Sequence, residues 1–307
     1  MAPSRYGQPG RAGWMGVLAL ALVLPLGTTG CSIKKMAVNS LAGTFASSSE
    51  VFASDEDPEL VGDALPFALK TMETLLRDVP NNKQLLLGAC QGFTQYGYAY
   101  VQAKGEEIED DDYIAAESYR QRAIKLYIRG RNYGLRGLEL DYPGITERLV
   151  AHPDSAAQEF DLKHLDMMFW TATSWGAAVA AGKDRPELVA DVPVVSAMMN
   201  RALELNESYG QGAIHETLIS LKALPPEMGG NTDEARRHFA RAVELSEGKR
   251  AGTFVTMAQS VSIQTQNKAE FEELMQRALA VDVDEVPAYR LQNILAQRKA
   301  AFMLERV

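Results

Sequence analysis

The sequence predicts an all-α protein built from degenerate tetratricopeptide-like helix pairs, and three observations lead to this fold class. From Pro58 to the C-terminus, apolar residues recur at helical spacing. The alternation of apolar and polar residues that marks half-buried strands is almost absent. The motif Arg201-Ala202-Leu203-Glu204-Leu205 returns in related form at residues 136, 241 and 277, as expected for an internal repeat.

The first predicted helix begins at Pro58. Asp57 suits the N-cap position, proline suits the first helical position, and Glu59 places negative charge near the positive end of the helix dipole. Later helices end at turn-forming segments such as Pro80-Asn81-Asn82 and Pro225-Pro226. The predicted helices are 58–78, 83–103, 112–140, 158–182, 188–206, 209–223, 232–246, 251–264 and 268–281, with a C-terminal helix near 287–304.

Upstream of the repeated motif, small and bulky residues follow the tetratricopeptide spacing A-x3-F-x2-A, most clearly at Ala235, Phe239 and Ala242. Small residues let two helices approach, a bulky residue fills the gap between them, and stacked pairs bury one continuous core. Any amphipathic helix also shows such intervals, which is the alternative interpretation. We predict an α-solenoid of four to five pairs, with packing residues Ala68, Met72, Met199, Ala202, Ala235, Phe239, Ala242, Met275 and Ala278.

Composition excludes several classes of protein. A hydrophobic fraction of 46% is too high for a disordered chain, and no Gly-X-Y period runs through the sequence. The formal net charge of −9 repels polyanions, so we expect no nucleic-acid partner. Cys90 lies in an apolar helical context and is expected to be a small buried hydrophobe.

Residues 1–30 have the pattern of a bacterial signal peptide. An apolar stretch from Trp14 to Leu26 is too short to span a membrane, and small residues follow it. Cys31 directly after a glycine resembles a lipobox, although Thr28 stands where leucine is usual, and ordinary cleavage is the alternative. We expect a lipid anchor at Cys31, a flexible tether over 31–57 and one helical domain over 58–307.

Cleavage of the signal peptide before Cys31 is expected to place the mature chain outside the cytoplasm. Ser32, directly after the lipidated cysteine, favours the outer membrane over the inner membrane.

Motifs for catalysis, cofactors or metals are not found. His215-Glu216 begins like a zinc-protease motif, but Ile219 stands where the second histidine belongs. The acidic run 106–112 lacks the spacing of a calcium loop and is expected to be a solvated loop that caps the next helix. Six basic residues follow between Arg120 and Arg136, and we expect them to pair with the acidic run. The sequence therefore favours a binding protein over an enzyme.

Aromatic side chains are the candidates for a ligand-binding surface. Phe93, Tyr96 and Tyr100 share one stripe of a helix, at i, i+3 and i+7. In a tetratricopeptide stack this first helix of a pair lines the concave surface, where an apolar ligand or a partner segment docks. Ordinary core packing is the alternative at each position. The full candidate set is Phe93, Tyr96, Tyr100, Trp170, Trp175, Tyr209 and His215.

Several segments resemble TatT, the T component associated with tripartite ATP-independent periplasmic (TRAP) transporters. These segments are Ala37-Val38-Asn39, Phe52-Ala53-Ser54-Asp55-Glu56-Asp57-Pro58-Glu59-Leu60, Ala64-Leu65-Pro66-Phe67, Gly92-Phe93-Thr94-Gln95-Tyr96-Gly97-Tyr98-Ala99, Arg131-Asn132-Tyr133-Gly134-Leu135-Arg136-Gly137, Tyr209-Gly210-Gln211-Gly212-Ala213-Ile214-His215 and Leu291-Gln292-Asn293-Ile294-Leu295-Ala296-Gln297-Arg298.

The resemblance implies a periplasmic lipoprotein that assembles as a homotrimer and docks the transporter's substrate-binding P component. It also implies a pore through the helices for a hydrophobic or organic-acid ligand, no catalysis and no cofactor. The alternative function is a tetratricopeptide scaffold for envelope assembly that carries no ligand.

Overall fold

The computed structural model describes residues 1–2 and 49–306. The predicted signal peptide, Cys31 and the tether up to residue 48 lie outside these residues, so these expectations remain predictions. The described part of the chain is helical throughout and contains no β-strand, which confirms the all-α prediction. None of its helices is both long enough and apolar enough to cross a membrane.

Most long helices lie where the sequence predicts them. The α-helices are α2 (Ser49–Ala53), α3 (Pro58–Asp78), α4 (Lys83–Tyr96), α5 (Ala103–Ile108), α6 (Tyr113–Glu139), α7 (Ile145–Ala151), α8 (Pro153–Ala157), α9 (Leu165–Ala181), α10 (Pro186–Val189), α11 (Val192–Leu205), α12 (Ala213–Lys222), α13 (Thr232–Leu245), α14 (Ala251–Met257), α15 (Lys268–Leu279) and α16 (Arg290–Leu304). Two π-helical segments, η1 (Gly97–Gln102) and η5 (Ala258–Ser262), and four 3₁₀ turns, η2 (Leu162–His164), η3 (Tyr209–Gln211), η4 (Pro226–Met228) and η6 (Pro287–Tyr289), lie between them.

Side-chain caps explain where several helices begin. The Asp57 carboxylate accepts a hydrogen bond from the Leu60 amide at 3.0 Å, which confirms the predicted cap before Pro58. The Asp112 carboxylate accepts in the same way from Ala115 and starts α6. Each of these bonds satisfies an amide that the first helical turn leaves free.

Two of the predicted helix boundaries are wrong, and two short helices are missed. The helix predicted to end at 103 continues through η1 and α5 to Ile108, so the acidic run begins within a helix. The helix predicted from 158 starts with η2 instead, where Asp161 caps the turn. Between them, α7 and α8 were not predicted. The Glu139 carboxylate accepts from the amides of Gly144 and Thr146 and so starts α7 directly after the turn.

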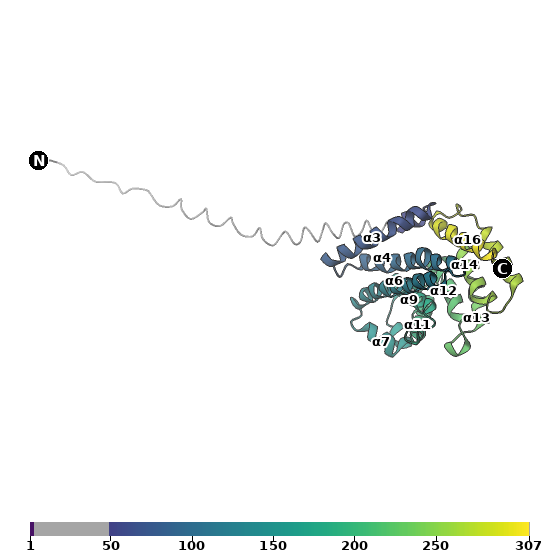
Figure 1. Cartoon of the computed structure of the whole chain (residues 1–307). Coiled ribbons are helices and arrows are strands. Elements are labelled where there is room, and N and C mark those ends of the chain that lie inside the picture. The colour runs from purple at the N-terminus through teal and green to yellow at the C-terminus, as the bar shows by residue number, and fades with distance from the viewer. Residues whose placement is uncertain (3–48, 307) are drawn as a thin grey trace.

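Successive helices pack side by side along the chain (Figure 1). The most extensive contacts join α4 with α6, α6 with α9, α9 with α11 and α12 with α13. A β-carbon on Gly130 or Gly134 of α6 would crowd atoms of both α4 and α9, and a β-carbon on Gly137 would meet the flexible end of Met167 in α9. The missing side chains at these glycines let α6 approach its neighbours closely.

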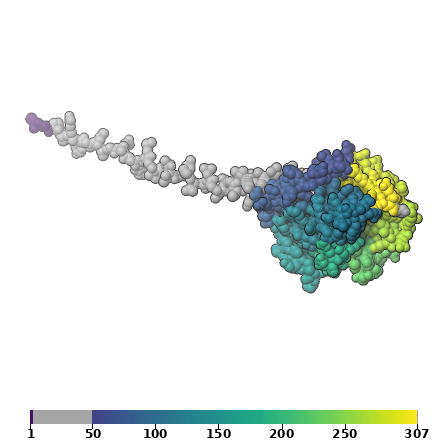
Figure 2. Space-filling view, in the orientation of Figure 1, coloured from purple at the N-terminus to yellow at the C-terminus, as the bar shows by residue number. Residues whose placement is uncertain are grey.

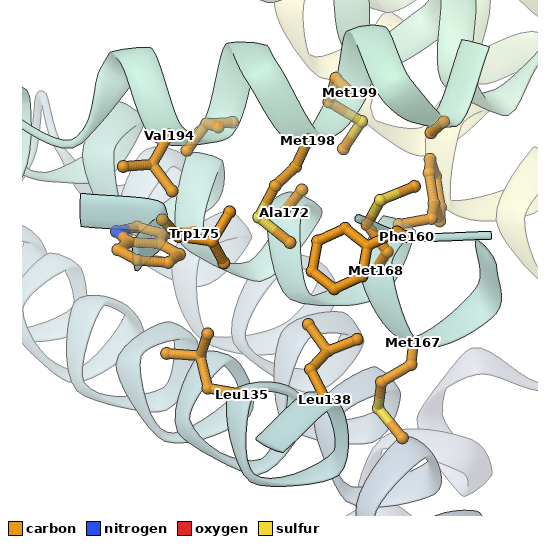
Figure 3. Close-up of a cluster of buried hydrophobic side chains, with 14 of the residues drawn as sticks. Leu135, Leu138, Phe160, Met167, Met168, Ala172, Trp175, Val194, Met198 and Met199 are labelled. Atoms are coloured by element: carbon orange, nitrogen blue, oxygen red, sulfur yellow. The ribbon is translucent and has the colours of Figure 1, made fainter. Parts of the chain in front are cut away.

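The core lies between these layers. Figure 3 shows Leu135 and Leu138 of α6 facing Met168, Ala172 and Trp175 of α9, with Met198 and Met199 of α11 on the opposite side. A second apolar cluster joins α12 to α16 through residues such as Phe254 and Phe271. Of the predicted packing residues, all but the half-buried Phe239 are buried.

The last helix meets the first ones. The Arg298 guanidinium pairs with Glu59 of α3, and Arg290 donates to the Ser54 carbonyl at 3.0 Å. Val61, Leu65 and Leu291 form a small buried apolar cluster there. Figure 2 shows the N-terminal helices lying directly against α16. The helical array therefore closes on itself.

This closure also explains the acidic run, for which the predicted pairing is wrong. Lys299 of α16 lies 2.9 Å from the Glu106 carboxylate, and Arg306 pairs with Asp110. Among the described residues, most basic side chains of α6 have other partners. Charge pairs between the two ends of a chain have no signature in local sequence spacing.

Candidate interaction site

The stripe formed by Phe93, Tyr96 and Tyr100 lies on α4 and η1 as predicted. The Tyr96 and Tyr100 rings stack with their centroids 5.8 Å apart, and Phe93 stacks on Tyr133 of α6 at 5.9 Å. Phe93 is only 3% exposed, whereas both tyrosines are half-buried. Core packing therefore accounts for Phe93, and the two tyrosines keep an accessible edge.

Guanidinium groups of α6 lie over these rings. Arg129 lies 4.7 Å from the Phe93 centroid, and Arg122 lies 5.9 Å from that of Tyr96. Arg136 lies 5.5 Å from the centroid of Tyr133, on its own helix. Such cation–π contacts hold a planar guanidinium in place and contribute on the order of 0.5–1 kcal/mol at exposed sites.

One carboxylate anchors this layer from α3. Glu73 accepts hydrogen bonds from Lys70 at 2.6 Å and from the Tyr133 hydroxyl at 2.7 Å, and it pairs with Arg129. Burial opposes ionisation of Glu73, but the hydrogen bonds from Lys70, Tyr133 and Arg129 outweigh it and lower its pKa. Glu73 is thus an ionised acceptor shared by three donors.

The Tyr100 hydroxyl is buried and has no hydrogen-bond partner among the described residues. Its ring packs against the backbone of α3 at Gly62, where a β-carbon would lie 2.6 Å from Cε1. Burial, together with the nearby Glu59 carboxylate, raises the pKa of Tyr100 to about 12. Tyr100 is therefore a neutral side chain at the contact between the first and last helices.

Trp175 contacts Asp191 and Arg131 rather than the aromatic stripe of α4. Its indole nitrogen donates to Asp191 Oδ2 at 2.7 Å, and the Arg131 guanidinium lies 4.9 Å from its centroid. Burial lowers the pKa of Arg131, whose nearest carboxylate contact, to Asp191, is 3.9 Å long. Trp175 is 2% exposed, so it belongs to the packed interior.

Trp170 and Tyr209 form a separate cluster around Phe169. The Tyr209 ring lies 5.0 Å from that of Phe169, and its hydroxyl donates to Asp166 Oδ1 at 2.8 Å. Trp170 contacts Phe169 edge-on at 5.6 Å. Burial and the hydrogen bond to Asp166 raise the pKa of Tyr209. Both rings are half-buried, so this cluster is a second candidate surface.

His215 faces a histidine that the sequence did not single out. Its Nδ1 lies 2.8 Å from Nδ1 of His238 on α13, so only one of these two atoms carries a proton. Burial lowers the pKa of His215, and burial together with His215 lowers the pKa of His238 to about 4. Over residues 49–306, no group of three or more His, Cys, Asp and Glu side chains could hold a metal ion.

The seven candidate residues therefore divide among four locations, and within the described chain no ring contact joins one location to another. The site that sequence reasoning missed is the set of α6 cations over the α4 and α6 rings. Its signal was present: Arg122, Lys125, Arg129 and Arg136 share one helical face by their spacing. The sequence predicts instead that these basic residues pair with the acidic run.

Other resembling segments serve the fold. Asn293 Oδ1 accepts from the Ala251 amide at 2.9 Å, and its Nδ2 donates to the Lys249 carbonyl at 3.0 Å, so this buried amide fixes the start of α14. Gln297 Nε2 donates to carbonyls at the end of α15, including that of Val281 at 2.7 Å. These side chains and Arg298 place α16 against both neighbours.

Comparison with known proteins gives two findings. A family model described as TRAP transporter T-component matches residues 54–307. An uncharacterized protein of Treponema pallidum (strain Nichols) is 30% identical over 297 residues, which cover 91% of this chain and 92% of that protein. The family match begins directly after α2, at Ser54, whose carbonyl Arg290 of α16 contacts, and it includes every helix from α3 to α16.

Proposed function

Because the chain belongs to the TRAP transporter T-component family, we propose that it is a periplasmic accessory protein that docks the substrate-binding P component. The observation that carries this proposal is the family match over the entire described helical array after Ala53. The family is one of transport accessories rather than enzymes. The proposed task is therefore binding, without a chemical step on a substrate.

Membrane attachment is part of the proposal. In this view a lipid on Cys31 holds the chain at the outer membrane, and the tether lets the helical array reach its partner. The lipid chains bury many methylene groups, at about 0.8 kcal/mol each, so release into water is negligible. Mass spectrometry of membrane-extracted protein tests this: the expected N-terminal peptide carries an acylated Cys31, and an unmodified cysteine contradicts the anchor.

We further infer that the helices form tetratricopeptide-like pairs α4/α6, α9/α11, α12/α13 and α14/α15. In two of these pairs the second helix carries small residues at both outer positions of the A-x3-F-x2-A pattern, namely Gly130 and Gly137 in α6 and Ala235 and Ala242 in α13. In the proposed assembly three copies associate, and a hydrophobic or organic-acid ligand passes through the helices toward the P component.

Native mass spectrometry tests docking and stoichiometry together. The chain without signal peptide and lipid is measured alone and after mixing with the P component encoded beside its permease. A homotrimer that takes up the P component is the expected result. A monomer that ignores the P component contradicts the proposal and favours the scaffold function, in which the same helical array binds envelope proteins.

A further inference from the structure

One exposed face of α6 carries basic and neutral side chains and no acid. The four cations of this face, Arg122, Lys125, Arg129 and Arg136, are here named the basic stripe. At 1.5 Å per residue, the stripe extends about 21 Å along the helix. The two acids of α6 point elsewhere: Glu117 bonds Arg120 and Gln121, and Glu139 starts α7. The neutral residues of this exposed face are Ser118 and Asn132.

The chain supplies little negative charge to this stripe. Among the described residues, Arg129 pairs with Glu73, whereas the polar partner of Arg122 is the Tyr96 hydroxyl, at 3.4 Å, and that of Arg136 is the Pro80 carbonyl, at 3.0 Å. Within residues 49–306, Lys125 takes part in no ion pair. Like charges three and four residues apart destabilise a helix. Within the described residues, Glu73 is the one carboxylate that pairs with the stripe, so most of this repulsion is not neutralised.

The stripe is also held in a fixed conformation. The three arginines lie over the rings of Phe93, Tyr96 and Tyr133 at 4.7–5.9 Å. A guanidinium that is already ordered loses less entropy when it binds, and its planar fork matches a carboxylate. Arginine and tyrosine are also enriched at protein interfaces. Three ordered arginines beside aromatic rings on an exposed helix face are therefore typical of a protein interface.

We propose that the basic stripe of α6 binds an acidic surface of the P component, an inference that rests on the proposed function. The chain as a whole carries a formal charge of −9 and repels an acidic partner over most of its surface. A single basic stripe then both accelerates the encounter and fixes the orientation in which the partner docks.

Binding of the P component to matched variants tests the inference. Arg122→Glu/Lys125→Glu reverses two exposed charges of the stripe, and Arg122→Gln/Lys125→Gln removes them. Lys163→Glu/Arg237→Glu makes the same change in net charge at side chains that are 73% and 70% exposed on η2 and α13. Circular dichroism confirms that each variant is folded, and calorimetry measures Kd at about 0.05 M and about 0.5 M NaCl.

The expected Kd rises at least about tenfold in the reversal variant, less in the neutral one, and stays within about twofold in the control. High salt weakens the wild-type complex. Equal affinity of all variants for the P component overturns the proposed role of the basic stripe but does not contradict the proposed function. If the wild type does not bind the P component, the proposed function fails, and the inference fails with it.

Binding to phosphatidylglycerol vesicles tests whether the stripe binds lipid headgroups instead of an acidic protein surface. The expected result is that the reversal and control variants bind these vesicles equally. If the reversal variant loses vesicle binding yet keeps the P component, the stripe binds phospholipid headgroups and the inference is overturned.

Discussion

The close approach of α6 to α9 at Gly134 leads to the prediction that alanine destabilises the protein at this helical position, opposite to its usual effect. Alanine is normally better than glycine inside a helix by about 1 kcal/mol. A β-carbon on Gly134, however, would overlap Thr171 Oγ1 and would lie 3.0 Å from Thr171 Cβ and 3.1 Å from Cys90 Sγ. Thr171 is fully buried and donates to the Met167 carbonyl at 2.6 Å, so it cannot rotate away freely.

Overpacking of this kind costs about 1–3 kcal/mol. We take its upper half, because the obstructing atoms belong to a β-branched side chain that a hydrogen bond fixes. After the gain in helix propensity, Gly134→Ala is expected to lower the free energy of unfolding by about 1–2 kcal/mol. In a domain of this size that corresponds to a fall in Tm of about 2–8 °C.

Thermal and urea unfolding, followed by circular dichroism, measure this effect. Gly88→Ala is the matched control, because its β-carbon would meet only Met72, at an ordinary 3.5 Å, and it should raise stability by up to about 1 kcal/mol. Adding Thr171→Ala to Gly134→Ala should restore part of the loss, with a coupling energy above about 0.5 kcal/mol. A Gly134→Ala protein that melts at or above the wild type would refute the close approach.

Three further predictions concern other contacts. Ala242→Phe should lower the free energy of unfolding by about 1–3 kcal/mol through overpacking, because Ala242 is only 1% exposed and packs against Gly212. An unchanged urea midpoint would show that α12 and α13 do not pack in this register. Asn293→Ala should cost about 1–3 kcal/mol in the same assay, because it leaves the Ala251 amide and Lys249 carbonyl without partners. The pKa of His238, lowered to about 4, means that the unfolded chain binds a proton first, so stability is complete above about pH 6.5 and falls as pH drops toward 4. His238→Gln should flatten this part of the stability–pH curve, and an unchanged slope would show that other groups cause it.

Local features of the fold could be predicted from the sequence. Asp57 before Pro58 marks a helix start because capping depends on neighbouring residues alone. The pattern around Ala235 and Ala242 identifies buried positions because a helix repeats its faces at short intervals. Cys90 is buried as predicted, and burial raises the pKa of its thiol to about 12.

Features that depend on distant contacts could not be predicted in this way. The sequence predicts no helix between residues 140 and 158, but the Glu139 carboxylate accepts hydrogen bonds from the amides of Gly144 and Thr146 and starts α7 there. The partners of Glu106 and Asp110 lie almost 200 residues further along the chain, on α16 and directly after it. The four locations of the candidate aromatics likewise follow from the stacking order of the helices, which single-helix periodicity does not contain.

The meeting of α16 with α2 and α3 has a consequence for the topology of the chain. An open array of repeats needs a special unit at each end, because the outermost helices would otherwise expose their apolar faces. Here each end of the described helical array covers the other, so neither outermost helix is left uncovered. A circularly permuted chain that begins at Asn231, after the exposed turn of η4, should therefore keep its native helix contacts. Its new linker must join residue 306 to residue 49 over roughly the length of α16, about 22 Å.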